Sequence, residues 1–177
     1  MEKHTTYTAM RTLGLPIPET WMLPPKSYAE NPDLQSTLDR YAKLFDLGAI
    51  GAELGYPLFM KPYDGGAWKG VTRIDDEQAL RTAYDESGTL VMHLQKAVHP
   101  FDCFVRCIGL GPQTTWVKYN PAAPLHDRYT MARDFISTEE QSLLADITLV
   151  INGMFGCTSP TRIRLVSPGG WVQHHVS

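Results

Sequence analysis

Residues 54–74, LGYPLFMKPYDGGAWKGVTRI, decide how the rest of the sequence is interpreted. The apolar run PLFMKP predicts a β-strand that brings Lys61 to its end, and VTRI predicts a second strand. The loop between them carries three glycines and a second lysine: Gly65, Gly66, Gly70 and Lys69. Backbone N–H groups of such a loop can approach an anion closely, while the ammonium groups neutralise its charge. By itself this order leaves two interpretations open, a phosphate-binding loop and an ordinary hairpin loop.

Hydrophobic spacing and turn residues predict mixed α+β structure around this unit. Helices are predicted over 3–13, twice within 31–55 with breaks at Gly48 and Gly51, from Asp75 or Asp76 to Glu86, and over 137–152. Asp33 is the predicted cap of the second helix, and Ser137 with Glu140 matches a capping box. The proline-rich segment 13–25 predicts an extended connection. Further strands are predicted over 89–95, 101–109, 114–119, 128–135, 161–166 and 170–176, mostly antiparallel in the second half.

Composition excludes several classes of protein. The 177 residues carry 16 Lys+Arg and 19 Asp+Glu, a net charge of −3, so we expect no nucleic-acid binding through bulk charge. No apolar run approaches the roughly 18 residues of a membrane span. Three cysteines do not suggest a disulfide framework, so a cytoplasmic location is the default expectation. Cys103 and Cys107, four apart on a predicted strand, are interpreted as buried packing residues rather than metal ligands.

Several motifs in one continuous order resemble the ATP-grasp family, in particular its carboxylate–amine ligases of the D-alanine–D-alanine ligase kind. MEK with LGLPIPET resembles the family's approach to its nucleotide-binding domain, and LGYPLFMKP resembles its strand ending in Lys-Pro. DGGAWKGV resembles its mobile glycine loop, and VMHLQKAVHPFDCFV its hinge strand beside adenine. The likeness covers residues 1 to about 120 and implies two lobes, with mostly antiparallel sheets, that clasp a nucleotide.

The resemblance implies a set of nucleotide contacts. Lys3 and Lys61 would bind the phosphates, and the loop with Gly65, Gly66, Lys69 and Gly70 would close over the β- and γ-phosphates. Gln95 replaces the family's glutamate near the adenine amino group, where its oxygen can still accept a hydrogen bond. The backbone of Lys96, Ala97 and Val98 would face the adenine edge, and Asp102 replaces the glutamate that binds ribose. Lys118 and Arg133, in preference to Arg128, would bind the transferred phosphoryl group or a substrate carboxylate.

Simpler interpretations remain open for these residues. Lys3, Lys69, Lys118, Arg128 and Arg133 could all be solvated surface charges. Asp102 could be an edge-strand acid, with Arg106 on the same alternating face as its partner.

The end of the sequence departs from the family pattern. All 19 acidic residues lie at or before Asp146, and residues 154–177 contain none. The family places its Mg²⁺ ligands there, as an acid on one strand and an acid-x-Asn pair on the next. The resemblance implies ATP as the cofactor. It also implies Mg²⁺, but this sequence lacks the acidic residues that would bind the ion. A fragment, a divergent or frame-shifted ending, and a module that has lost catalysis are the three explanations; a truncated or altered C-terminus is favoured.

The sequence as a whole predicts the ATP-binding region of an ATP-dependent carboxylate–amine ligase that acts through an acylphosphate. Residues 1–30 would lead in from an absent substrate domain, 31–94 would form the small glycine-loop lobe, and 95–177 the hinge and an incomplete larger lobe. Its partners would be small carboxylate and amine substrates, and the chain alone is expected to be inactive. The alternatives are a non-catalytic ATP/ADP-binding module and an unrelated α+β binding domain. Nothing in the sequence indicates an oligomeric state.

Overall fold

The computed structural model describes residues 3–28, 32–41, 45–64, 69–98, 103–120, 122–132, 134–155, 161–167 and 172–176. Among the helix and strand residues, the side chains of Lys3, Pro32, Tyr41, Leu125, Phe155, 161–167 and 172–176 are outside this description. Contacts divide the chain into two units: residues 19–97, and residues 1–18 together with 98–177. The sequence predicts boundaries at 30/31 and 94/95, whereas the contact units change at 18/19 and 97/98.

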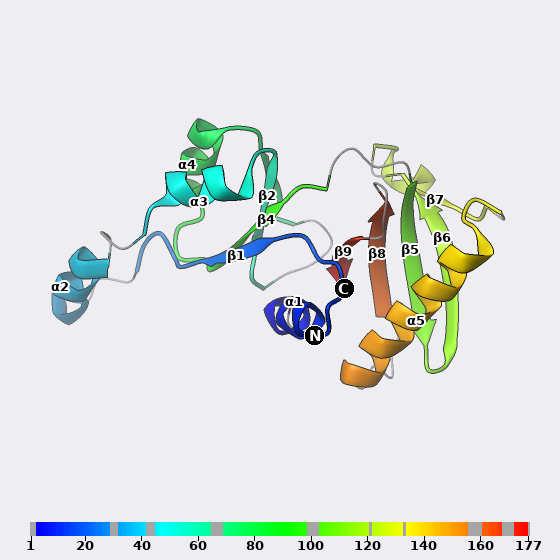
Figure 1. Cartoon of the computed structure of the whole chain (residues 1–177). Helices are drawn as coiled ribbons and strands as arrows, with labels where there is room; N and C mark the ends of the chain where they lie inside the picture. The colour runs from blue at the N-terminus through cyan, green and yellow to red at the C-terminus, as the bar shows by residue number, and fades with distance from the viewer. Residues whose placement is uncertain are drawn as a thin grey trace. The chain divides into compact units, whose positions relative to one another are not determined.

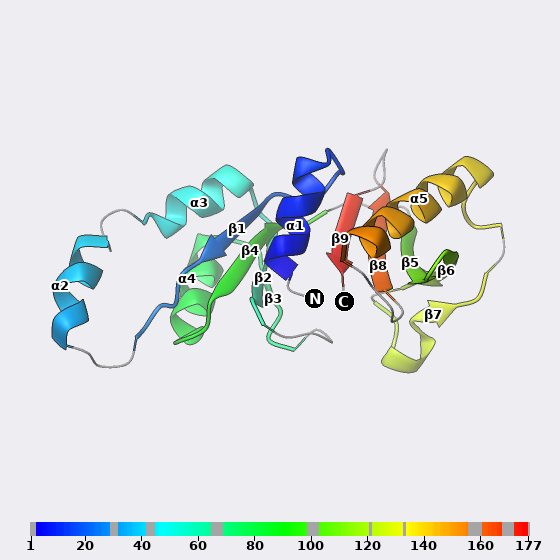
Figure 2. The same ribbon diagram turned by 90° about the horizontal axis from the view of Figure 1, so that it is seen from below.

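The unit of residues 19–97 contains a four-stranded antiparallel sheet in the order β1-β4-β2-β3 (Figure 1; Figure 2 labels all four strands). Its strands are β1 (Thr20–Leu23), β2 (Leu58–Pro62), β3 (Thr72–Ile74) and β4 (Met92–Lys96). Its helices are α2 (Pro32–Tyr41), α3 (Leu47–Leu54) and α4 (Glu77–Glu86). The predicted strands PLFMKP and VTRI and the helix ending at Glu86 are confirmed.

Strand alternation gives this sheet two chemically different faces. Leu58 and Met60 of β2 and Met92 and Leu94 of β4 lie in one core cluster with α3 and α4 residues such as Leu80. Successive side chains of a strand point to opposite faces, so the residues between them lie on the other face. That face carries Phe59 and Lys61 of β2, His93 and Gln95 of β4, and Thr20 and Met22 of β1.

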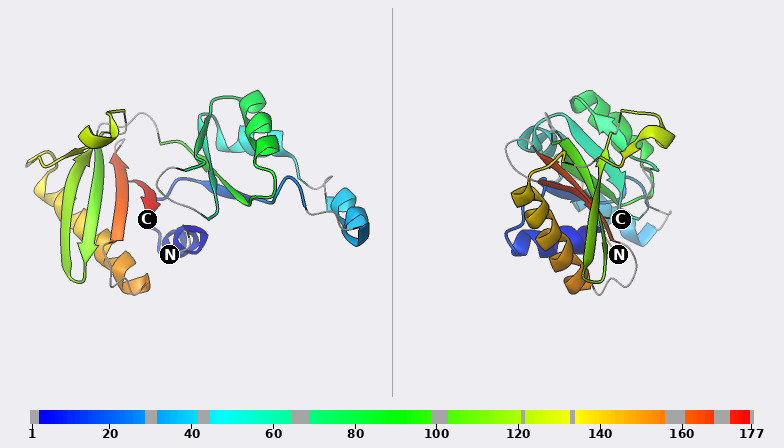
Figure 3. Two further views of the ribbon diagram at one scale, coloured as in Figure 1. Left: turned by 180° about the vertical axis from the view of Figure 1, so that it is seen from behind. Right: turned by 90° about the vertical axis from the view of Figure 1, so that its right-hand side faces the viewer.

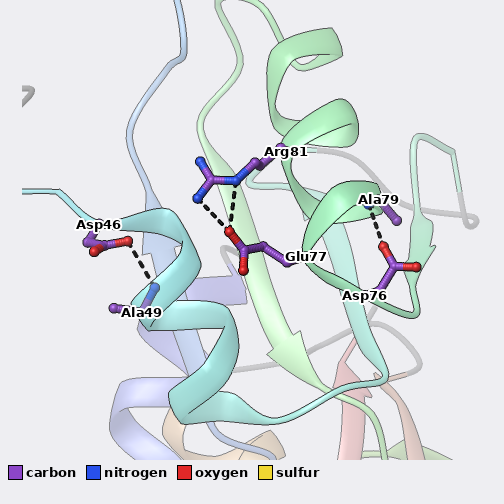
Figure 4. Close-up of polar contacts among 6 residues, drawn as sticks. All are labelled: Asp46, Ala49, Asp76, Glu77, Ala79 and Arg81. Atoms are coloured by element: carbon purple, nitrogen blue, oxygen red, sulfur yellow. Dashed lines mark hydrogen bonds and ion pairs between the residues drawn. The ribbon is translucent and has the colours of Figure 1, made fainter.

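Side-chain caps fix where α3 and α4 begin (Figure 4). The Asp46 carboxylate accepts from the Ala49 N–H at 3.0 Å, and the Asp76 carboxylate accepts from the Ala79 N–H at 2.8 Å. Such caps satisfy backbone donors that have no partner within the helix. Asp76 is therefore the cap, as the sequence predicted, whereas the prediction for Asp33 is wrong: this residue lies in the first turn of α2.

The predicted helix breaks at Gly48 and Gly51 are also wrong, because both residues lie within α3. A Cβ atom at Gly51 would lie 2.4 Å from the Tyr56 hydroxyl oxygen and 2.7 Å from Leu80 Cδ2. Here glycine allows α3 to pack closely against its neighbours. The break between α2 and α3 instead falls between Tyr41 and Leu47.

The other unit contains a five-stranded antiparallel sheet in the order β7-β6-β5-β8-β9. Its strands are β5 (Cys103–Leu110), β6 (Gln113–Tyr119), β7 (Tyr129–Thr130), β8 (Thr161–Ser167) and β9 (Val172–Val176). Its helices are α1 (Lys3–Thr12), α5 (Thr138–Phe155) and a short 3₁₀ turn, Leu125–Asp127. Helix α5 crosses one face of the sheet against β5, β6 and β8 (Figure 2).

Local signals account for much of this second unit. The predicted β5–β6 hairpin is confirmed: Leu110 pairs with Gln113 around a tight turn in which Gly111 has a φ of +57° (Figure 3). The capping box is confirmed too, since Glu140 accepts from the Ser137 N–H at 2.7 Å. The strand predicted over 128–135 shrinks to the two residues of β7. No helix among the described residues is long and apolar enough to cross a membrane.

Gly51→Ala tests the packing account of α3. Alanine favours a helix over glycine by about 1 kcal/mol, but overpacking a core costs about 1–3 kcal/mol. We therefore expect Gly51→Ala to lower the unfolding midpoint in urea, followed by circular dichroism. Gly153→Ala on α5 is the control, because no atom lies within 4 Å of its added Cβ, and it should raise the midpoint. A Gly51→Ala chain as stable as Gly153→Ala would contradict the account.

Candidate nucleotide site

A chain of two hydrogen bonds crosses the face of the four-stranded sheet that is opposite its apolar core. The Lys61 ammonium on β2 donates to Gln95 Oε1 on β4 at 2.5 Å. Gln95 Nε2 donates to the Thr20 hydroxyl oxygen on β1 at 2.7 Å. β4 lies between β1 and β2 in the sheet, and Thr20 is the register partner of Gln95. Three strands thus bring these three side chains together.

Burial makes the Lys61–Gln95 hydrogen bond important. Lys61 is 4% exposed and Gln95 is fully buried. Removing an ammonium group from water is costly unless acceptors replace its hydration. The amide oxygen of Gln95 is one such acceptor, and it is uncharged. A phosphate oxygen would be a further, charged acceptor for this ammonium group, so the arrangement is compatible with an anionic ligand.

His93 lies on the same face, directly opposite Lys61 in the β2–β4 register. Its imidazole is fully buried and stacks on the ring of Tyr63, with centroids 5.4 Å apart. Neither His93 nor Thr20 was predicted as a site residue from the sequence. Within MHLQK, residues 92–96, the polar residues alternate with core residues, and this signal could have identified His93. Thr20 gave no comparable local signal, because the proline-rich segment 13–25 does not predict the strand β1.

The remaining predicted residues of the first unit belong to the end of β4 or to the segment between β2 and β3. The backbone N–H of Lys96 donates to Glu19 at 2.9 Å, and that of Ala97 donates to Pro57 at 3.1 Å. The side chain of Lys69 is exposed. Gly70 has a φ of +69°, and a Cβ there would lie 2.8 Å from Pro62 Cγ, so the loop returns close to the end of β2. Gly65 and Gly66 lie outside the described residues.

Two of the predicted residues of the other unit, Val98 and Lys118, can be placed by their contacts. Val98 packs against Phe104 and Tyr119. Lys118 is exposed on β6, where it pairs with Val105 and Thr130.

The description leaves three more predictions on this unit open. Lys3 opens α1, and only its backbone is described. Asp102 and Arg133 lie outside the described residues, so the proposed Asp102–Arg106 pair stays a prediction. The Arg106 guanidinium lies 5.1 Å from the Tyr129 ring centroid.

A groove of about 1080 Å³ lies in the same unit as Lys61 but involves core-face residues such as Phe45, Leu47 and Tyr84. Its cations have local ion-pair partners, Lys26 with Asp85 at 2.5 Å and Arg81 with Glu77 at 2.6 Å. Asp46 at its edge caps α3. Neither Lys61 nor Gln95 lines this groove. The charged side chains named here form ion pairs or cap a helix within the same unit, so the groove is not the candidate nucleotide site.

Cys107 is a core residue, as the sequence predicted. It lies in the cluster beneath α5, with half-buried Cys103 packed against the same cluster. Burial raises the pKa of the Cys107 thiol to about 12, while its hydrogen bond with Thr148 acts in the opposite direction. Within the described ranges, no group of three or more His, Cys, Asp or Glu residues could hold a metal ion.

Known structures define the class of this fold. The D-alanine–D-alanine ligase of Bacillus anthracis, complexed with ATP, matches 99% of the chain with a TM-score of 0.69 and 16% identity. An ADP complex of the N5-carboxyaminoimidazole ribonucleotide synthetase PurK matches 99% with a TM-score of 0.69 and 17% identity. The chain covers 54% and 44% of these two structures. The fold is the α+β fold of the ATP-grasp ligases, as the sequence predicted.

Sequence comparison finds relatives with higher identity to this chain than the two solved structures have. The chain is 32% identical over 130 residues to a D-alanine–D-alanine ligase of Dechloromonas aromatica, covering 67% of the chain and 37% of that protein. It is 26% identical over 154 residues to the vancomycin C-type resistance protein VanC1 of Enterococcus gallinarum, covering 85% of the chain and 38% of that protein. No protein-family model matches. The chain is therefore an ATP-grasp relative, similar to D-alanine–D-alanine ligases, and spans less than two fifths of these curated relatives.

The raised pKa of Cys107 predicts its reactivity. At pH 8.5 the buried thiol stays protonated, and a protonated thiol is a poor nucleophile. We expect iodoacetamide to modify Cys103 well before Cys107 in the folded chain, and both at similar rates in urea. Trypsin cleavage after Arg106 separates the two cysteines into different peptides, so mass spectrometry can measure each. Rapid modification of Cys107 in the folded chain would show that the core placement is wrong.

Proposed function

We propose that this chain is the ATP-binding region of an ATP-dependent carboxylate–amine ligase. The observation that carries the proposal is the buried Lys61 ammonium held by Gln95 on the face of the sheet opposite the core. Two structural neighbours are complexes with ATP or ADP, which supports a nucleotide as the ligand. The relatives named as D-alanine–D-alanine ligases support the ligase class.

Each predicted residue has a role in this proposal. Lys61 neutralises phosphate charge, together with Lys3 and the loop containing Gly65, Gly66, Lys69 and Gly70. Gln95 Oε1 keeps a second lone pair with which to accept from the base. The backbone of Lys96, Ala97 and Val98 lines the base, and Asp102 binds the ribose hydroxyls. Lys118 and Arg133 bind the transferred phosphoryl group or the substrate carboxylate.

The proposed reaction has two steps. A substrate carboxylate oxygen attacks the γ-phosphorus, the bond to the bridging oxygen breaks, and ADP departs, so that an acylphosphate forms. The amine nitrogen then attacks the acyl carbon, inorganic phosphate leaves with the bonding electron pair, and the nitrogen loses a proton to water to give the amide. The chain's cations would balance the charge that moves onto the leaving oxygens. The substrates are a small carboxylate and a small amine, and the expected location is the cytoplasm.

The residues present do not fit a magnesium site of the expected kind. Mg²⁺ requires oxygen ligands, commonly carboxylates. The sequences of β8 and β9 contain no aspartate or glutamate, and neither does any other residue from 154 to 177. The same observation favours a second candidate function, a module that binds ATP or ADP without catalysis.

Lys61→Ala tests the nucleotide site. A hydrogen bond to a charged group contributes about 1.5–3 kcal/mol, so the variant should bind ATP about 10- to 100-fold more weakly in isothermal titration calorimetry. Lys26→Ala is the matched control. Lys26 pairs with Asp85 in the groove lined by Phe45, Leu47 and Tyr84, which we call the helix-side groove, so this variant should leave ATP affinity unchanged. No ATP binding by the unsubstituted chain, or equal losses in both variants, would contradict the proposal.

Magnesium distinguishes the two candidate functions. The same titration is run with and without Mg²⁺, and release of inorganic phosphate is measured with a carboxylate and an amine present. A chain that catalyses the ligase reaction by itself would bind ATP more tightly and release phosphate with Mg²⁺; because residues 154–177 contain no carboxylate side chain, we expect neither from this chain. An ATP affinity that is the same with and without Mg²⁺, together with no phosphate release, would support the non-catalytic module.

A further inference from the structure

The amide of Gln95 has a different partner at each end. Its oxygen faces the Lys61 ammonium at 2.5 Å, and its nitrogen faces the Thr20 hydroxyl at 2.7 Å. An ammonium group only donates hydrogen bonds, so the amide atom beside it must be the oxygen. The nitrogen then points to Thr20, whose hydroxyl oxygen can accept. The two neighbours together define which way the amide is turned.

Thr20 holds its end of this arrangement through the backbone. It begins β1, and the β1–β4 register pairs it directly with Gln95. The adjacent hydrogen bond from the Lys96 N–H to the Glu19 carbonyl, at 2.9 Å, ties the start of β1 to the end of β4. Without the hydroxyl, a buried N–H of Gln95 would lose its acceptor, and such a loss favours rotation of the amide toward another partner.

In this orientation the Gln95 amide can still form hydrogen bonds with a ligand. Oε1 has two lone pairs and uses one for Lys61; Nε2 has two N–H groups and uses one for Thr20. One acceptor and one donor therefore remain. Adenine presents a matching edge, with the N6 amino donor beside the N7 acceptor, whereas a 6-oxo purine presents two acceptors there. Gln95 is fully buried in the structure. A base can therefore contact its amide only if it replaces the protein atoms that now cover this side chain.

From this geometry we infer that Thr20 is a positioning residue for base selection. By accepting from Gln95 Nε2, its hydroxyl keeps Oε1 beside Lys61 and the amide turned toward a 6-amino purine. The inference rests on the proposed nucleotide site and adds to it the residue that sets the preference for an amino over an oxo group. Thr20 acts through Gln95 and need not touch the nucleotide.

The test compares two substitutions of Thr20 that differ in the hydroxyl group. Thr20→Val keeps the branched shape and removes the acceptor, whereas Thr20→Ser keeps the acceptor. Calorimetry measures the affinities for ATP and for inosine triphosphate, in which a 6-oxo group replaces the amino group. A typical hydrogen bond contributes about 0.5–1.5 kcal/mol, so Thr20→Val should reduce the ATP-over-ITP preference by about 2- to 12-fold. Thr20→Ser should retain the preference.

Thr82→Val is the control for losing a threonine hydroxyl. Its hydroxyl donates to the Gln78 carbonyl at 3.0 Å on exposed α4, away from Gln95, so the ATP-over-ITP preference should stay unchanged. An unchanged preference in Thr20→Val, or a change of the same size in Thr82→Val, would overturn the inference while leaving ATP binding intact. Failure of the unsubstituted chain to bind either nucleotide would overturn the proposed function, and the inference with it.

A second measurement needs no nucleotide. The side-chain amide protons of Gln95, assigned by their loss in Gln95→Glu, report on the hydrogen bond to Thr20 in ¹H–¹⁵N NMR spectra. We expect the two resonances to be well separated and slow to exchange with solvent in the unsubstituted chain and in Thr20→Ser. In Thr20→Val they should shift and exchange faster. Identical spectra and exchange in all three chains would overturn the inference.

Discussion

Strand alternation in the four-stranded sheet is the constraint on which both its apolar core and the Lys61–Gln95 hydrogen bond depend. Leu58 and Met60 alternate with Phe59 and Lys61 on β2, and Met92 and Leu94 alternate with His93 and Gln95 on β4. A slip of either strand by one residue would reverse its faces and place polar groups in the apolar core. Burial of an ammonium or an amide without partners would then oppose folding. The same alternation that builds the core therefore positions the candidate site.

Local signals predicted much of the fold, and tertiary contacts decided the rest. Caps such as Asp76 and Ser137, and the turn at Gly111, depend on residues within a few positions, so the sequence was sufficient there. The strand β1 was missed because its pairing with β4 joins residues some 70 positions apart. Gly51 was misinterpreted as a helix break because the reason for glycine, contact with Tyr56 and Leu80, is visible only in the packed structure.

The candidate site divides in the same way. Lys61 and Gln95 were identified from the motif resemblance, and the structure brings them into contact. Thr20 and His93 were missed because their relation to Lys61 depends on cross-strand register. The contributions of Gly65, Gly66, Asp102 and Arg133 stay predictions, since these residues lie outside the described ranges. The carboxylate-free sequence after Asp146 was read directly, and it continues to separate a ligase from a module that only binds nucleotide.

The central claim is that the face of the sheet carrying Lys61 and Gln95 binds nucleotide. A ¹H–¹⁵N NMR titration of the chain with ATP tests it most directly, because every assigned backbone amide reports its own surroundings. The account predicts large, saturable shifts at Lys61, His93 and Gln95, with little change at Ser27 and Asp85 of the helix-side groove. Shifts confined to the groove, or an unchanged spectrum at saturating ATP, would contradict it.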